Sequence, residues 1–253
     1  MLDHWKRPFA HPRAIALRLG LARQMDFVRA RLSPTGYLGL HLTLGAVVLV
    51  GAAWLFGGIA EDVVTGDPLT LVDARVAAWF HARATPLFTL PMLLISNLHG
   101  TWGITALSLA LALVLLWQRA WNWLLALVLV VPGGMLLNVL TKHAFGRARP
   151  SFADPILALN TYSFPSGHVA AATLFYGLLA AIIVTGIDAW RWRILVALLA
   201  FLIVALVALS RVYLGAHYLS DVLAGLAEST AWLALCLTAM HTLRRRRSAG
   251  RGG

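Results

Sequence analysis

The chain has 253 residues, of which 60% are hydrophobic and only 12% are charged. Soluble globular chains average about 45–50% apolar and about 25% charged residues, so this composition indicates a polytopic membrane protein. The net charge of +11 does not indicate nucleic-acid binding, because the basic residues gather at the two chain ends beside apolar runs, as at the cytoplasmic ends of membrane proteins.

Six apolar runs approach the length of about 20 residues that a membrane-spanning helix needs. They are 37–60, 100–117, 120–141, 168–187, 192–210 and 217–243. Between the first two runs, a polar loop at 61–70 precedes two short apolar stretches, which we expect to be helices at the membrane surface or propping the bundle. The predicted fold class is all-α: a polytopic six-transmembrane-helix bundle with short interfacial helices between spans one and two.

The sequence predicts one membrane domain, 36–243, between a basic N-terminal segment, 1–35, and a basic tail, 244–253. Six spans place both termini on one side of the membrane, and the positive-inside rule makes that side the cytoplasm. Arg119 and Arg191 fall in connections on the same side. The single cysteine, Cys236, allows no intrachain disulfide.

Three polar stretches emerge together on the opposite side: KHAFGRARP at 142–150, PSGH at 165–168 and SRVYLGAHYLSD at 210–221. We therefore expect them to converge in space. They carry three cations, which are costly near a bilayer unless they face a cavity or a partner. These cations, Lys142, Arg149 and Arg211, together indicate an anion of more than one charge, such as a phosphate monoester.

Two histidines in these stretches have residues beside them that suit phosphoryl chemistry. Asp221 lies four residues after His217, a spacing that shares one face of a helix, and could orient the histidine as a nucleophile. A structural His–Asp pair is the alternative. His168 follows Ser166 and Gly167 at a predicted helix start, where N–H groups bind anions and a histidine can act as an acid. A plain N-cap and a solvated loop histidine are the alternatives there.

Together the three stretches resemble the signature of the type 2 phosphatidic acid phosphatase superfamily. That signature reads K, six residues, RP; then PSGH; then SR, five residues, H, three residues, D. Its positions are matched by Lys142, Arg149, Pro150, Pro165, Ser166, Gly167, His168, Ser210, Arg211, His217 and Asp221. The resemblance covers about residues 140–225 by motif and the whole chain by its six-span plan.

The resemblance implies a role for each matched residue. His217 corresponds to a nucleophile that forms a phosphohistidine, Asp221 to its orienting partner, and His168 to the acid that protonates the leaving group. The implied phosphate-binding groups are Lys142, Arg149, Ser166, Gly167 and Arg211. No metal or other cofactor is expected. Arg147, inside the first motif, is either a contact to a second phosphate or headgroup, or a solvated loop arginine.

The implied function is that of a lipid phosphatase in a bacterial inner membrane, with its site facing the periplasm. The partners are the bilayer and a lipid phosphate or diphosphate, with undecaprenyl diphosphate expected first. Phosphatidylglycerophosphate, phosphatidate and a lipid A phosphate are alternative substrates. A lipid-to-lipid phosphotransferase would use the same residues. The sequence also leaves room for a vanadium-dependent haloperoxidase, or for a transporter or scaffold with an inactive site, and it does not indicate the oligomeric state.

Overall fold

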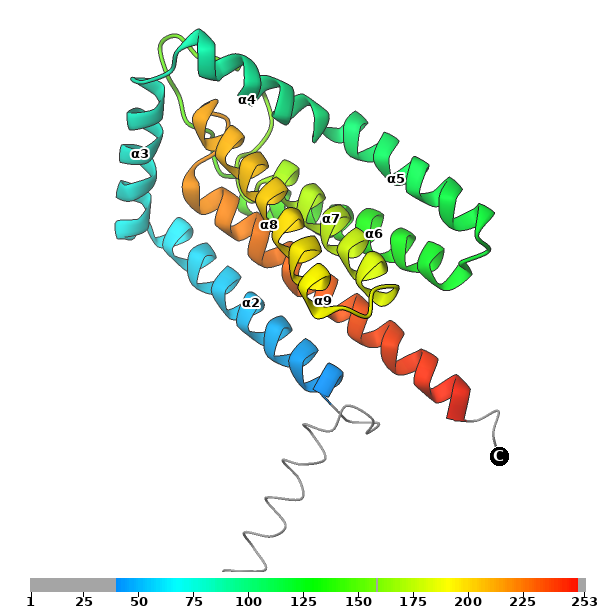
Figure 1. Ribbon diagram of the computed structural model, residues 1–253. Coiled ribbons are helices and arrows are strands. Elements are labelled where there is room, and N and C mark those ends of the chain that lie inside the picture. Colours follow the sequence, from blue (N-terminus) through cyan, green and yellow to red (C-terminus); the bar gives the residue numbers. More distant parts are fainter. Residues whose placement is uncertain (1–39, 158, 250–253) are drawn as a thin grey trace, which may run out of the picture.

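The computed structural model describes residues 40–157 and 159–249, with side chains up to residue 244 (Figure 1). The predicted N-terminal segment 1–35 lies outside this part. The described residues form helices joined by turns and one long loop. The helices are α2 (Leu40–Thr65), α3 (Pro68–His81), α4 (Pro86–Leu98), α5 (Thr101–Trp117), α6 (Trp121–Phe145), α7 (Gly167–Thr185), α8 (Trp190–Tyr213) and α9 (Leu219–Ala249).

Five of these helices, α2, α6, α7, α8 and α9, are long and apolar enough to cross a membrane. A sixth span arises if α4 and α5, which meet at a bend of 50°, count as one broken span. A helix satisfies its backbone groups internally, which is why these apolar runs fold as helices. The all-α membrane fold is confirmed, and the two short apolar stretches expected between the first two spans form the short helices α3 and α4.

Some helix ends lie beyond the predicted limits. The expected polar loop at 61–70 is largely helical, because α2 continues to Thr65 and α3 already begins at Pro68. Proline suits the first turn of a helix, where its missing N–H is not needed. The first residues of the expected tail at 244–253 are helical, because α9 continues to Ala249.

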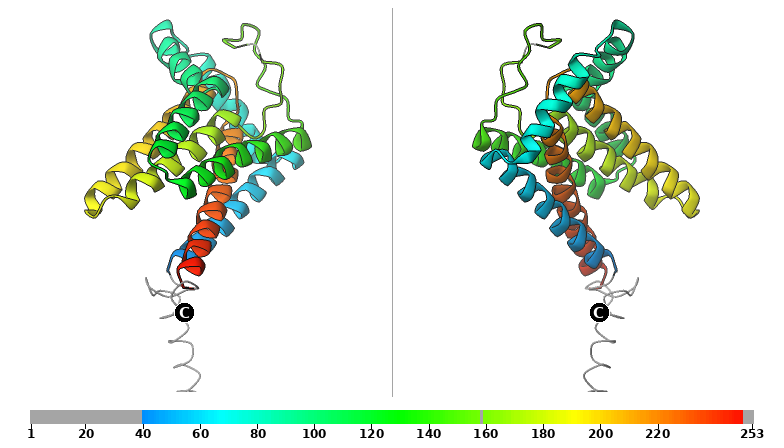
Figure 2. Two further views of the ribbon diagram at one scale, coloured as in Figure 1. Left: turned by 90° about the vertical axis from the view of Figure 1, so that its right-hand side faces the viewer. Right: turned by 90° about the vertical axis from the view of Figure 1, so that its left-hand side faces the viewer.

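The bundle is built around α7, whose residues from Val169 to Phe175 are buried between α6, α8 and α9. On the outside, α2 packs along α9. The rings of His41 and His241 lie 4.5 Å apart, so α2 begins and α9 ends at the same end of the bundle. Figure 2 shows the long loop between α6 and α7 at the opposite end.

The Pro132-Gly133-Gly134 segment lies within α6 and allows neighbouring helices to approach. A side chain at position 134 would collide with Leu174 of α7 and with Trp232 of α9. Trp232 also donates its Nε1–H to the Leu129 carbonyl of α6 at 3.1 Å. The glycines therefore allow α6 to pack closely against α7 and α9.

Candidate active site

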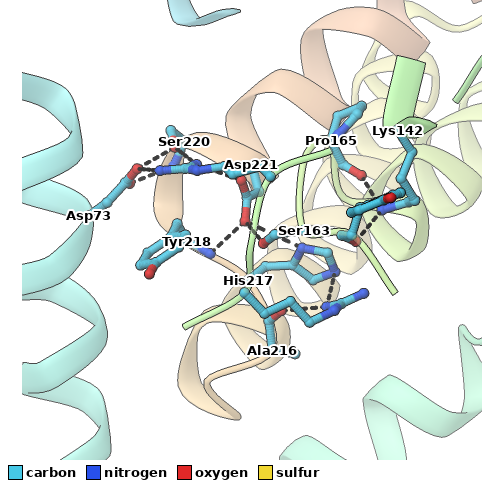
Figure 3. A network of polar contacts seen from close by, with 12 residues as sticks. Asp73, Lys142, Ser163, Pro165, Ala216, His217, Tyr218, Ser220 and Asp221 are labelled. Carbon is cyan, nitrogen blue, oxygen red and sulfur yellow. Dashed lines mark hydrogen bonds and ion pairs between the residues drawn. The ribbon is translucent and has the colours of Figure 1, made fainter. Parts of the chain in front are cut away.

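The three polar stretches meet at the end of the bundle that carries the long loop (Figure 3). Lys142 lies in the last turn of α6, and Gly146 then adopts a left-handed conformation, with φ of 58°, that turns the chain into the loop. At the other end of that loop, the N–H of Ser166 donates to the carbonyl of Asp221 at 2.9 Å. This bond joins the start of α7 to the start of α9.

His217 is buried, with 2% of its surface exposed, in the connection between α8 and α9. Its Nε2 lies 3.2 Å from a terminal nitrogen of Arg149. Arginine can only donate, so Nε2 is an acceptor and the neutral ring carries its proton on Nδ1. Nδ1 lies 3.5 Å from Oδ2 of Asp221, which is ion-pair range but longer than a normal hydrogen bond.

The geometry brings His217 and Asp221 together by a different route from the one predicted. The two residues do not share a helix face, because α9 begins only at Leu219. Instead, Oδ2 of Asp221 reaches back over the helix start and accepts the N–H of Tyr218 at 2.8 Å. A side chain in the first turn commonly caps a helix in this way. The same oxygen accepts the hydroxyl of Ser163.

Burial lowers the pKa of His217 to about 4, although Asp221 opposes the shift. A lowered pKa means that the ring stays neutral until the pH falls to about 4, whereas an ordinary histidine is half protonated near pH 6.5. We therefore predict that His217 remains neutral at pH 5.5. Nitrogen NMR of histidine-labelled protein in detergent, with His217→Gln to assign the signal, should show no titration between pH 8 and 5.5. A midpoint near 6.5 would contradict the prediction.

The predicted phosphate-binding cations are held by oxygen atoms around the site. Lys142 donates to the carbonyls of Tyr162 and Pro165, both at 2.9 Å. Arg149 donates to the carbonyl and hydroxyl of Thr161 at 2.7 and 2.8 Å, and to the Ala216 carbonyl at 2.5 Å. The long loop thus helps to hold both cations, and Arg149 lies beside His217.

A third cation, Arg211 in the last turn of α8, is 3% exposed and donates to the hydroxyl of Ser96 on α4. Within the described residues its Nε has no hydrogen-bond partner. A buried N–H without a partner is uncommon in proteins and suits a bound acceptor such as a phosphate oxygen. Arg211 therefore has a donor available for an anion.

A cavity of about 1060 Å³ begins at these groups and runs between α5, α6 and α7. Its polar end is lined by Lys142, Arg149, Gly167, His168, Arg211 and His217. The rest is largely apolar, with Ile104, Leu109, Ala112, Leu127, Val128, Val131, Met135 and Val139 among its lining residues. From Lys142 back to Leu127 the lining follows α6 for roughly 22 Å, at about 1.5 Å per residue.

Two predicted site residues do not line the cavity. Asp221 contacts His217 from outside the lining, as an orienting residue would. Ser166 is fully buried as the N-cap residue of α7, and its hydroxyl has no partner among the described residues. Its predicted contact with phosphate therefore stays a prediction. The backbone at Gly167, the first residue of α7, does reach the cavity.

Arg147 has neither of the roles considered for it from the sequence. Its guanidinium is 13% exposed, forms ion pairs with Asp73 at 2.8 Å and Asp221 at 2.6 Å, and does not line the cavity. Both predictions were wrong because they assumed that Arg147 contacts solvent or substrate. Its partners are instead the buried carboxylates of Asp73 on α3 and of Asp221. The available signal was an acidic residue within the apolar stretch LVDARVAAWF.

Comparison with known proteins finds relatives that are named as phosphatases of lipids. The chain is 38% identical to phosphatidylglycerophosphatase B of Bacillus subtilis over 43% of its length, and 39% identical to a lipid A 1-phosphatase of Rhizobium johnstonii over 54%. It is 30% identical to the undecaprenyl-diphosphatase of Sulfolobus acidocaldarius over 45%. The matches span only about half of these relatives, 53%, 52% and 53% of their respective lengths.

A solved structure extends the likeness beyond the motifs. The transmembrane PAP2-type phosphatidylglycerolphosphate phosphatase from Bacillus subtilis matches with a TM-score of 0.69 and 27% identity, over 76% of this chain and 94% of that one. The model of the PAP2 superfamily matches residues 121–245, which contain every residue of the predicted site. Residues 121–245 of this chain therefore belong to the PAP2 superfamily.

Proposed function

We propose that this protein is an integral membrane phosphatase that removes phosphate from a lipid phosphate or diphosphate. The observation that carries the proposal is the position of His217 at the cationic end of a cavity whose remainder is largely apolar. A phosphate group would lie among Lys142, Arg149 and Arg211, and its hydrocarbon tail would follow the apolar part toward the bilayer. The PAP2 relatives are named for lipid phosphates of this kind.

The proposed reaction has two in-line steps. Nε2 of His217 attacks phosphorus, a P–N bond forms as the P–O bond to the lipid breaks, and His168 gives its proton to the departing oxygen. Water then attacks phosphorus and gives its proton to His168, a P–O bond forms as the P–N bond breaks, and neutral His217 and protonated His168 return with the release of free phosphate. Fixed cations at the transferring phosphoryl group stabilise the charge of both transition states, which is usually the largest catalytic contribution.

The substrate within this class is a finer proposal. Undecaprenyl diphosphate, phosphatidylglycerophosphate, phosphatidate and a lipid A phosphate share the phosphate on a lipid tail that the cavity suits. The relatives divide among three of these names, and we propose undecaprenyl diphosphate and phosphatidylglycerophosphate as the first pair to compare. The substrate is tested by measuring phosphate release from each of the four lipids separately, at equal mole fraction in detergent with the purified protein. A phosphorylated lipid product without free phosphate would instead favour the phosphotransferase alternative.

The cavity makes a prediction about the lipid tail. Replacing Ala112 of α5, which lines the apolar part, by phenylalanine should fill space that the tail needs. We expect kcat/KM for a long-chain lipid phosphate to fall about tenfold or more, since each buried methylene contributes about 0.8 kcal/mol. A short-chain phosphate should be hydrolysed as before.

The matched control is Ala110→Phe, which adds the same ring on an exposed position of α5 outside the cavity lining. Equal losses in the two variants, or equal losses on short and long chains, would place the tail elsewhere.

We propose that the site faces the periplasm of a bacterial inner membrane and that both termini are cytoplasmic. The proposal is supported by the common end that His41 and His241 mark and by the basic residues near the chain termini. Asp154 lies in the long loop with a 90% exposed side chain. When Cys236→Ala has removed the native cysteine, the Asp154→Cys variant should react with a membrane-impermeant maleimide added to spheroplasts. Labelling only after lysis would reverse the orientation.

A further inference from the structure

A buried carboxylate outside the predicted site contacts the start of α9. Asp73 of α3 is fully buried, with 0% of its surface exposed. It accepts the N–H of Ser220 at 2.9 Å and also the hydroxyl of Ser220. Its other close partner is Arg147, at 2.8 Å. Figure 3 shows Asp73 approaching Ser220 and Asp221 from the side opposite His217. A carboxylate this deeply buried needs a paired cation, so its position is tied to Arg147.

Arg147 connects this carboxylate to the predicted orienting residue. One terminal nitrogen binds Asp73, and the other donates to Oδ1 of Asp221 at 2.6 Å and to the Ser220 hydroxyl at 2.7 Å. The guanidinium also lies over the ring of Tyr218, 4.4 Å from its centre. Burial acts to lower the pKa of Arg147, but the attraction of Asp221 and Asp73 outweighs it, so the pKa is raised and the charge is retained.

The contacts divide the two oxygens of Asp221 between two partners. Oδ1 faces Arg147, while Oδ2 faces His217, Ser163 and the Tyr218 N–H. Neither Asp73 nor Arg147 lines the cavity, in contrast to Lys142, Arg149 and Arg211. Asp221 contacts both Arg147 and His217, and so connects Asp73 and Arg147 to the site.

The charges of Asp73, Arg147 and Asp221 indicate how this group acts on His217. Arg147 alone would cancel the charge of Asp221, and His217 would then gain positive charge beside a neutral pair during the reaction. With Asp73 present, two carboxylates face one guanidinium, and the group keeps a net charge of −1. That charge matches the positive charge that His217 acquires when its Nε2 bonds to phosphorus, since an opposite charge within about 4–6 Å stabilises the charged form.

We propose that Asp73 and Arg147 are positioning residues: Arg147 fixes the carboxylate of Asp221, and Asp73 offsets the Arg147 charge so that Asp221 can stabilise the phosphorylated His217. This inference rests on the proposed function, because it assigns a role within the phosphohistidine step. It makes α3, which lies outside the matched PAP2 residues, a part of the catalytic apparatus.

A double-mutant cycle on kcat tests the charge argument. Asp73→Asn should lower kcat about 10- to 100-fold, as removing an outer partner of a functional histidine commonly does, because Arg147 then neutralises Asp221. Arg147→Gln should cause a similar loss, because two carboxylates without their shared cation favour uptake of a proton, and a proton on Asp221 removes the charge that faces His217. The double variant restores a net charge of −1 at Asp221, so its kcat should be about tenfold higher than that of either single variant.

The KM should stay within about threefold of wild type throughout, since neither residue lines the cavity. Arg147→Lys keeps the charge and should lose less kcat than Arg147→Gln; it also replaces that variant in the comparison if Arg147→Gln does not fold. The matched controls are Asp67→Asn and Arg83→Gln, exposed residues at the two ends of the same helix. Thermal unfolding in detergent reports on folding in each case.

Losses that add in the double variant, losses confined to KM, or single variants as active as wild type would overturn the positioning role. These results are distinct from failure of the proposed function, in which the wild-type protein itself would neither release phosphate nor form phosphohistidine.

Discussion

Replacing His217 by alanine is expected to lower phosphate release by at least about a thousandfold while leaving a folded, membrane-inserted protein. The expected loss is large because the variant lacks the atom that bonds to phosphorus, whereas the cations around the site remain. Lys142 and Arg149 also donate to backbone carbonyls, which remain in the variant when Arg149 loses its contact with the His217 ring. Substrate binding should therefore survive, and the loss should appear in kcat.

The measurement is steady-state phosphate release by the wild type and the variant at equal protein concentration. His41→Ala is the matched control, because it removes an imidazole at the far end of the bundle, where His41 contacts His241. Activity within tenfold of wild type in His217→Ala would exclude this residue as the nucleophile.

Replacing His168 by alanine should produce a loss that depends on the leaving group. His168 lines the cavity at the start of α7, close to the cationic end. An alkoxide that leaves from a phosphate monoester needs a proton, and general acids contribute about 100- to 10,000-fold to such steps. A phosphate that leaves from a diphosphate is a far weaker base and needs little protonation. We expect a loss of about 100-fold or more on phosphatidate and less than about tenfold on undecaprenyl diphosphate.

The two losses are compared within one preparation, so differences in folding or insertion cancel. His143→Ala is the control, because His143 also lines the cavity but is not a position of the signature. Equal losses of His168→Ala on both substrates would mean that His168 acts in binding or structure rather than as the leaving-group acid.

The membrane fold could be predicted closely from the sequence because each span is marked by a long apolar run. An apolar run as long as 120–141 favours a helix, since a helix satisfies its backbone polar groups within the segment itself. The ends were less predictable. Glu61 and Asp62 look like a loop, but the helix continues through them to Thr65. The bend between α4 and α5 depends on how the bundle packs, which the local pattern does not record.

The candidate site divides in the same way. Motif residues such as Lys142 and His217 could be predicted to lie close together, because the number of predicted spans puts their polar stretches on the same side of the membrane. Asp73 could not, because its contact with Arg147 joins residues 74 positions apart and depends on how α3 crosses the end of the bundle. The pairing of His217 with Asp221 was predicted from helix spacing, but a capped helix start brings them together instead.

The proposed mechanism depends on the transfer of phosphate from a lipid to His217, and trapping the P–N bond is its most direct test. Purified protein in detergent and EDTA is mixed with a lipid phosphate labelled in its phosphorus, quenched in alkali within the first turnover and digested for mass spectrometry. We expect one base-stable, acid-labile phosphate on the peptide that contains His217, absent in His217→Ala and formed as fast as free phosphate appears. Free phosphate released at full rate with no labelled peptide, or with label on another residue, would be incompatible with a phosphohistidine at position 217.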